Sequence, residues 1–219
     1  MKKTKKIKRI KKPDSRYRNV IVCLDEAVDR YLPAKFDRVF TILEVGVFAG
    51  QRSEEMIKHC LEVRKLPAVS FAGFDLFEDM TPDRNIAEFG KPRLAPRMEK
   101  VRARLISNRV LVSLFRGDTL ETLPVAKSLF RGVVDFVFLD GGHSLETIAS
   151  DWSHVKEMLA PGGICLFDDY YDDRNDVGCK HLIDSLKDDP VWDAKALDPI
   201  DRVEKAKLDI RTARVSRRS

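Results

Sequence analysis

The chain has 219 residues, 43% of them hydrophobic, which is enough for one domain with a full core and argues against a mainly disordered protein. The net charge of +5 is concentrated at the ends: residues 1–20 hold ten Lys or Arg and one Asp, residues 211–219 hold four Arg, and the body between is acidic. No apolar run approaches the ~20 residues that span a bilayer, and four cysteines without a Cys-x-x-Cys pair indicate free thiols in a reducing, cytoplasmic compartment.

We expect two parts in the chain: a basic, disordered tail over residues 1–17 and a single domain over 18–219. Within the domain, apolar spacing predicts a helix over 20–36 that ends near Pro33. A buried strand over 39–47 and a helix over 51–64 follow, joined by a turn that contains Gly46 and Gly50. Strand, glycine turn and helix form the phosphate- or nucleoside-binding unit of Rossmann-like folds, although tight packing of the turn explains the two glycines equally well.

The next segments contribute two acidic candidates. A strand over 69–77 ends at Asp75, about 25 residues beyond the glycine turn, where an acidic residue commonly binds ribose hydroxyls; a capping or surface role is the alternative. The polar segment 78–96 is expected to be a loop over the site, followed by a basic helix over 96–106. A third strand over 110–115 leads to Asp118 and to a short helix over 122–130 that begins near Pro124.

The segment with most chemistry is the apolar strand 134–139, which ends at Asp140, two glycines and His143. A helix to 159, a turn over 160–163 and a fifth strand over 164–167 bring in Asp168 and Asp169. Because carboxyl ends of parallel strands meet at one edge, we expect three carboxylates and an imidazole to converge there as a metal site with an acid/base group. Each Asp could instead cap a helix, and His143 could be an ordinary surface residue.

The predicted fold class is α/β: a Rossmann-like, doubly wound, mostly parallel seven-stranded sheet with an antiparallel C-terminal hairpin. The repeated strand–helix order predicts the parallel part. After a helix over 176–186, alternating patterns over 191–197 and 206–215 predict the two hairpin strands.

Five motifs occur in order at spacings that resemble a known family: Glu44-x-Gly46-x-x-x-Gly50, Asp75, Gly117-Asp118, Asp140-Gly-Gly-His143, and Leu-Ala-Pro-Gly-Gly before Asp168-Asp169. Over residues 40–215 the chain resembles class I S-adenosylmethionine-dependent methyltransferases. Among these it is similar to the metal-dependent small-molecule O-methyltransferases that act on sugars of macrolide and aminocoumarin natural products.

The resemblance implies roles for individual residues. It implies that the cofactor-binding residues are Glu44, Gly46, Gly50, Ser53, Asp75 and Asp118. It implies that Asp140, Asp168 and Asp169 hold a divalent cation, which hard oxygen ligands suggest is Mg²⁺, and that Asp140 and His143 are catalytic, with His143 as general base. The family usually has a small hydroxyl residue two positions after the second glycine. Here that position is Arg52, followed by Ser53, and Arg52 could contact the cofactor carboxylate itself.

The leading hypothesis is therefore an O-methyltransferase with a small hydroxylated acceptor, a sugar or glycoside. A nucleic-acid methyltransferase guided by the basic tail is less favoured, because the body is acidic and the chain lacks an Asn/Asp-Pro-Pro-Tyr motif. A non-catalytic cofactor-binding scaffold is the third hypothesis, and nicotinamide binding fits the glycine spacing poorly. Assembly into a homo-oligomer and the identity of the acceptor stay open.

Overall fold

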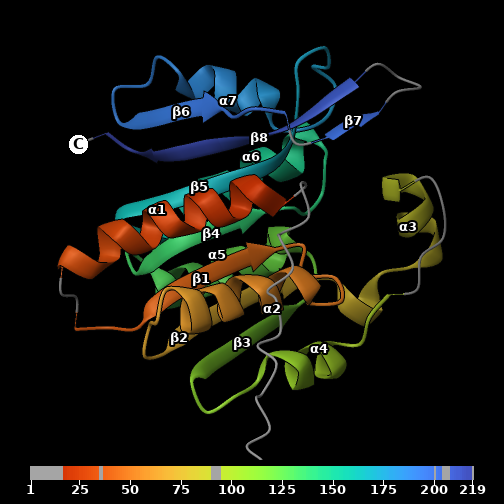
Figure 1. Cartoon of the computed structure of the whole chain (residues 1–219). Helices are drawn as coiled ribbons and strands as arrows, with labels where there is room; N and C mark the ends of the chain where they lie inside the picture. Colours follow the sequence, from red (N-terminus) through yellow and green to blue (C-terminus); the bar gives the residue numbers. More distant parts are fainter. Residues whose placement is uncertain (1–16, 35–36, 90–94, 200, 204–207, 219) are drawn as a thin grey trace, which may run out of the picture.

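The structure is a computed structural model that describes residues 17–34, 37–89, 95–199, 201–203 and 208–218. The predicted basic tail, apart from Tyr17, lies outside the described residues. One twisted sheet forms the centre of the molecule and helices cover both of its faces (Figure 1). The predicted α/β fold is confirmed.

Among the described residues, seven strands of the sheet lie in the order β3-β2-β1-β4-β5-β8-β6, and an eighth, β7, pairs with β8. The parallel strands are β1 (Phe40–Val45), β2 (Val69–Asp75), β3 (Val110–Arg116), β4 (Val134–Leu139) and β5 (Leu159–Tyr171). The antiparallel strands are β6 (Trp192–Ala196), β7 (Asp201–Val203) and β8 (Leu208–Arg217). Strand order reverses between β1 and β4, which is the point where open α/β sheets form a crevice for ligands.

The parallel centre follows from the sequence, because every residue of β1 and of β4 is buried, as expected for strands covered on both faces. On one face lie α1 (Arg18–Ala34), α2 (Gln51–Lys58) with its π-helical continuation His59–Val63, and α4 (Met98–Leu105). On the other lie α5 (Thr119–Phe130), α6 (Leu145–Met158) and α7 (Lys180–Leu186) (Figure 1). None of the described helices is long and apolar enough to cross a membrane.

Three local predictions were wrong. The polar segment expected as a loop over 78–96 contains a 3₁₀ turn, Phe77–Asp79, and a helix, α3 (Pro82–Phe89). Helix α5 begins at Thr119, well before Pro124, because the Asp118 carboxylate accepts a hydrogen bond from the Leu120 amide and caps the helix. Residues 160–163, expected as a turn, lie inside β5, where Gly162 adopts a φ of 80° and the register with β4 shifts.

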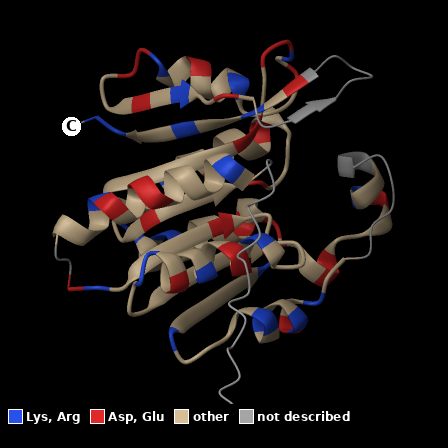
Figure 2. Cartoon of the chain, in the orientation of Figure 1, with Lys and Arg blue, Asp and Glu red and all other residues tan. Residues whose placement is uncertain are grey.

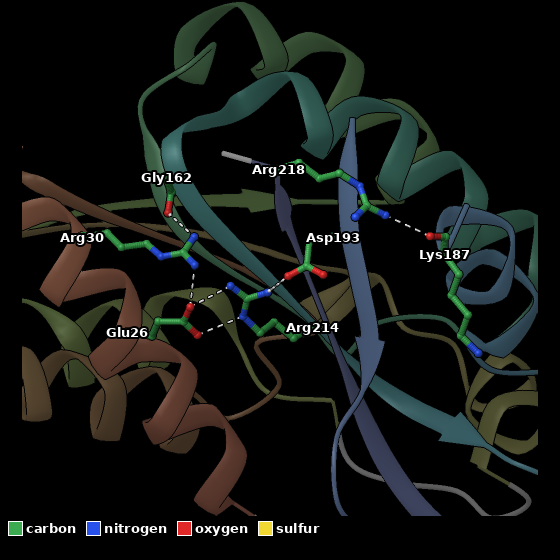
Figure 3. A network of polar contacts seen from close by, with 7 residues as sticks. All are labelled: Glu26, Arg30, Gly162, Lys187, Asp193, Arg214 and Arg218. Carbon is green, nitrogen blue, oxygen red and sulfur yellow. Dashed lines mark hydrogen bonds and ion pairs between the residues drawn. The ribbon is translucent and has the colours of Figure 1, made fainter. Parts of the chain in front are cut away.

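An ion network around the buried Arg214 fixes α1 against the antiparallel side of the sheet (Figure 3). Arg214 of β8 donates to both carboxylate oxygens of Glu26 on α1, at 2.7 and 2.9 Å, and to Asp193 of β6 at 3.0 Å. Arg30 donates to the same Glu26 carboxylate at 2.6 Å. Because this network holds α1 across the sheet, the first described residue of the chain, Tyr17, is held at the carboxyl edge of the parallel strands.

Candidate functional site

A cavity of about 510 Å³ opens at the carboxyl edge of the sheet, around the point where the strand order reverses. Its walls come from the ends of the five parallel strands, from β8, and from residues of α1, α2, α3 and α6. Eight of the ten residues predicted for the site line it: Glu44, Gly46, Asp75, Asp118, Asp140, His143, Asp168 and Asp169. The other two, Gly50 and Ser53, lie just behind the wall.

Gly46 and Gly50 are each required to be glycine for a different structural reason. Gly46 has a φ of 88°, and a Cβ there would lie 1.9 Å from the backbone oxygen of Asp140, so only glycine lets the ends of β1 and β4 approach so closely. Gly50 has a φ of 72°, and its Cβ would lie 2.9 Å from Val101 Cγ1 of α4. Gly46 therefore shapes the floor of the cavity, whereas Gly50 lets the beginning of α2 pack against α4.

Glu44, at the end of β1, is 1% exposed and is the most buried carboxylate of the site. Ser53, on the first turn of α2, donates a hydrogen bond from Oγ to Glu44 Oε2. Burial raises the pKa of Glu44 to about 8, and the Ser53 hydrogen bond opposes that rise only in part. In this structure Ser53 therefore orients Glu44 from behind.

Asp75 and Asp118 lie at the ends of β2 and β3 and both contact backbone amides. Asp75 accepts hydrogen bonds from the Phe48 amide at 2.8 Å and the Phe77 amide at 2.6 Å, and burial raises its pKa. Asp118 caps α5 and forms an ion pair with Arg84 of α3 at 2.5 Å. Burial alone would raise the pKa of Asp118, but the hydrogen bonds from Arg84 and from the α5 amide lower it. Both carboxylates thus have structural roles and also face the cavity.

Three aspartates form a compact cluster at the ends of β4 and β5. One carboxylate oxygen from each of Asp140, Asp168 and Asp169 lies within 4.8 Å of the other two. Burial, and then the neighbouring carboxylates, raise the pKa of Asp140 well above its usual range and that of Asp168 to about 6. Asp168 Oδ1 is buried and has no hydrogen-bond partner among the described residues. Crowded, incompletely satisfied carboxylates are the oxygen donor set that a divalent cation requires, so the residues fit one.

His143 joins this cluster through Asp169. The ring nitrogen Nδ1 of His143 lies 2.7 Å from Asp169 Oδ2, and the Tyr171 hydroxyl donates to Asp169 Oδ1 at 2.6 Å. Burial would raise the pKa of Asp169, but the His143 contact holds it below its usual value. The Gly178 amide also donates to the His143 carbonyl at 2.9 Å, and the Cys179 amide to the Asp169 carbonyl at 3.1 Å. The segment before α7 therefore holds the backbone at His143 and the backbone at Asp169 together.

Sequence reasoning missed several residues of the site. Tyr17 of the expected tail, Arg84 of the expected loop and Thr212 of β8 all line the cavity. Asp151 of α6 lies 4% exposed behind the cluster and lines a small adjoining cavity. Its helical position between Ile148 and Trp152 is the only signal in the sequence, since a carboxylate on an apolar helix face is unusual.

Comparisons with known proteins identify the domain and its fold. A family model described as a methyltransferase domain, Methyltransf_24, matches residues 43–170. The O-methyltransferase NovP has a TM-score of 0.61 and 20% identity, covering 94% of this chain and 80% of its own. A putative rRNA-methylase from Clostridium thermocellum has a TM-score of 0.51 and 18% identity, covering 90% and 96%.

The methyltransferase MycE of the mycinamycin pathway was solved with Mg, SAH and mycinamycin VI. It has a TM-score of 0.50 and 15% identity, and the match covers 87% of this chain and 48% of MycE. No curated protein matches the chain. At these identities the solved structures establish a shared fold, whereas the family match covers more than half of the sequence.

Proposed function

The chain belongs to the methyltransferase-domain family and has the class I methyltransferase fold, and from this premise we propose that it is an S-adenosylmethionine-dependent O-methyltransferase. The acceptor is a small hydroxylated molecule of the sugar or glycoside class. The observation that carries this proposal is the cluster of Asp140, Asp168 and Asp169 beside His143, in the wall of one cavity. The volume of that cavity is within the range typical of small-molecule sites.

Residues at the ends of the other parallel strands would bind the cofactor. Asp75 would bind the ribose hydroxyls, because each of its carboxylate oxygens accepts one amide hydrogen and has capacity for another. Asp118 would lie beside the adenine, and Glu44 at the amino-acid end. The cofactor supplies the methyl group on a sulfonium, and the chain's residues bind and orient it for an in-line displacement.

The three aspartates would hold the divalent cation, with Mg²⁺ favoured because all three donors are hard oxygens. When bound, a divalent cation lowers the pKa of a hydroxyl and orients acceptor oxygens. The MycE complex contains Mg and SAH together with mycinamycin VI, and this pairing of a cation with the cofactor product supports the same pairing in this chain.

His143 is the proposed general base. Asp169 accepts a hydrogen bond from Nδ1 of the ring, which favours the tautomer in which Nε2 takes up a proton. Nε2 would then take up the proton from the hydroxyl group of the methyl acceptor while the methyl group is transferred. Asp169 also stabilises the imidazolium that results, so it supports His143 as well as the cation.

The experiment that tests this function is methyl transfer from S-adenosylmethionine to a panel of sugars and glycosides, with added Mg²⁺ or with excess chelator. We expect turnover of at least one hydroxylated acceptor, loss of turnover in chelator and recovery on adding Mg²⁺. Turnover that is unaffected by chelator would contradict the metal-assisted mechanism.

One observation favours a second candidate, a nucleic-acid methyltransferase: the ten Lys or Arg residues among residues 1–20. Deleting residues 1–12 separates the two candidates. If the acceptor is a small molecule, the deletion leaves its methylation unchanged. If the acceptor is RNA or DNA, the deletion abolishes methylation of that polymer and flattens the salt dependence of binding.

A further inference from the structure

Arg52, on the first turn of α2, is a cation in the wall of a cavity that is otherwise rich in carboxylates. Its guanidinium stacks over the ring of Tyr17 and lies 5.6 Å from the ring centre of Phe138. Tyr17 directly precedes α1 and Phe138 belongs to β4, so the guanidinium is held between the helices and the sheet. Stacking on aromatic rings fixes the plane of a guanidinium and leaves its N–H edge available.

No ion pair to Arg52 occurs among the residues that the structure describes, and its buried Nε has no hydrogen-bond partner there. Other partly buried arginines of the chain have partners. Arg38, for example, forms two hydrogen bonds to Asp135, at 2.6 and 2.7 Å. A charged guanidinium without a hydrogen-bonding partner costs free energy, so the part of Arg52 that lines the cavity is suited to an anion brought by a ligand.

The charges around Arg52 indicate which end of a ligand it meets. Phe138, whose ring centre lies 5.6 Å from the guanidinium, pairs in register with Glu44 of β1 and precedes Asp140 by two residues, so Arg52 lies beside the acidic groups at the ends of β1 and β4. Asp75 and Asp118, at the proposed nucleoside end, lie at the ends of β2 and β3, farther along the sheet from β4. A zwitterionic ligand group, with one ammonium and one carboxylate, would place the ammonium near the acidic side chains and the carboxylate near Arg52.

We propose that Arg52 binds the α-carboxylate of the amino-acid part of S-adenosylmethionine. This inference rests on the proposed function, which supplies a cofactor with an amino-acid end. The amides of the first turn of α2 favour an anion at the same place, since Arg52 is the second residue of that helix. Arg52 is thus a specificity-determining residue that distinguishes cofactors with a carboxylate from nucleosides without one. An anionic group on the acceptor is the competing source of the same chemistry.

Calorimetric titration with two ligands tests the proposal. The first is S-adenosylhomocysteine, and the second is decarboxylated S-adenosylhomocysteine, which keeps the nucleoside, thioether and ammonium groups. For the full-length protein we expect the carboxylate to strengthen binding by about 10- to 100-fold, the range for a charge-assisted hydrogen bond. In Arg52→Met we expect S-adenosylhomocysteine to bind about as weakly as the decarboxylated ligand, whose own affinity stays unchanged. Arg52→Lys should recover part of the difference.

Lys58→Met is the matched control, because Lys58 is an exposed cation on the same helix and does not line the cavity. It should leave both affinities unchanged, and thermal unfolding of each variant establishes that it is folded. Equal affinities of the unsubstituted protein for the two ligands would overturn the proposal. So would an Arg52→Met variant that keeps full affinity for S-adenosylhomocysteine but loses turnover of an anionic acceptor. Failure of the unsubstituted protein to bind either ligand would instead contradict the proposed function itself.

Discussion

Nδ1 of His143 lies 2.7 Å from Oδ2 of Asp169, so the proposed base and a proposed metal ligand share one hydrogen bond. His143 follows β4 and Asp169 lies near the end of β5, and each is in addition held by a backbone amide of the segment before α7. This contact joins the acid/base group to the carboxylate cluster. It fixes the ring orientation in advance of substrate binding.

The first prediction concerns that base. His143→Gln should lower kcat by about 10²- to 10⁴-fold, the usual contribution of a positioned general base, and leave S-adenosylhomocysteine affinity nearly unchanged. Steady-state kinetics together with calorimetry measure both quantities. His181→Gln is the control, because His181 is exposed on α7. A His143→Gln enzyme with normal kcat would remove His143 from the mechanism.

The second prediction concerns Asp168 and has two opposite parts. Asp168→Asn should weaken Mn²⁺ binding by more than about 10-fold, because a ligand is lost. In metal-free protein at pH 8 the same change should raise the melting temperature, because it removes a negative charge from a crowded, buried cluster. Electron paramagnetic resonance measures free Mn²⁺, and calorimetry measures unfolding. Asp173→Asn, at an exposed position on the following loop, should do neither.

Loss of stability in metal-free Asp168→Asn would indicate that the carboxylate has a structural partner. Unchanged Mn²⁺ affinity would show that the cluster is not the cation site.

The third prediction is a pH dependence of stability that comes from Asp151. Burial raises the pKa of Asp151 to about 7 in the folded chain, against about 3.9 in an unfolded one. Between these values the folded state holds a proton that the unfolded state has released, so Asp151 makes stability fall as pH rises from about 4 to about 7. Asp151→Asn should remove this decline and stabilise the protein at pH 8 more than at pH 4.5. Parallel pH dependences of the melting temperature in the two proteins would contradict the assignment.

The sequence predicted which acidic residues would lie together better than it predicted the helices around them. Asp140, Asp168 and Asp169 could be placed together because parallel strands end at one edge, and the strand pattern was strong enough to align those ends. Helix α3 was missed because its polar composition and flanking prolines resemble those of a loop. The beginning of α5 was misplaced because Pro124 was taken as the start, whereas the Asp118 cap decides it.

Individual side-chain pairs between segments distant in sequence could not be predicted. That Asp169 contacts His143 depends on the backbone bonds of Gly178 and Cys179, and the sequence carries no pattern for those. The position of Tyr17 over Arg52 depends on how α1 crosses the sheet, which long-range ion pairs determine. Figure 2 illustrates why charge patterns did not reveal these pairs: acidic and basic residues are mixed over the described helices and loops.

The fourth prediction concerns the network that holds α1. Arg214 has a side chain only 4% exposed and binds both Glu26 and Asp193 (Figure 3). Arg214→Met should lower the free energy of unfolding by about 1.5–3 kcal/mol, because charged partners lose their hydrogen bonds. Arg218→Met, which removes an exposed arginine just beyond β8, should change it by less than about 0.5 kcal/mol. Chemical denaturation measures both values, and equal effects would show that burial of Arg214 contributes little.

The central claim is that the cavity binds S-adenosylmethionine next to a carboxylate-held cation. Its most direct test is calorimetric titration of the full-length protein with S-adenosylhomocysteine, with and without Mg²⁺. We predict a micromolar dissociation constant. Absence of binding under both conditions would contradict the claim and would favour a scaffold that keeps the fold without the chemistry.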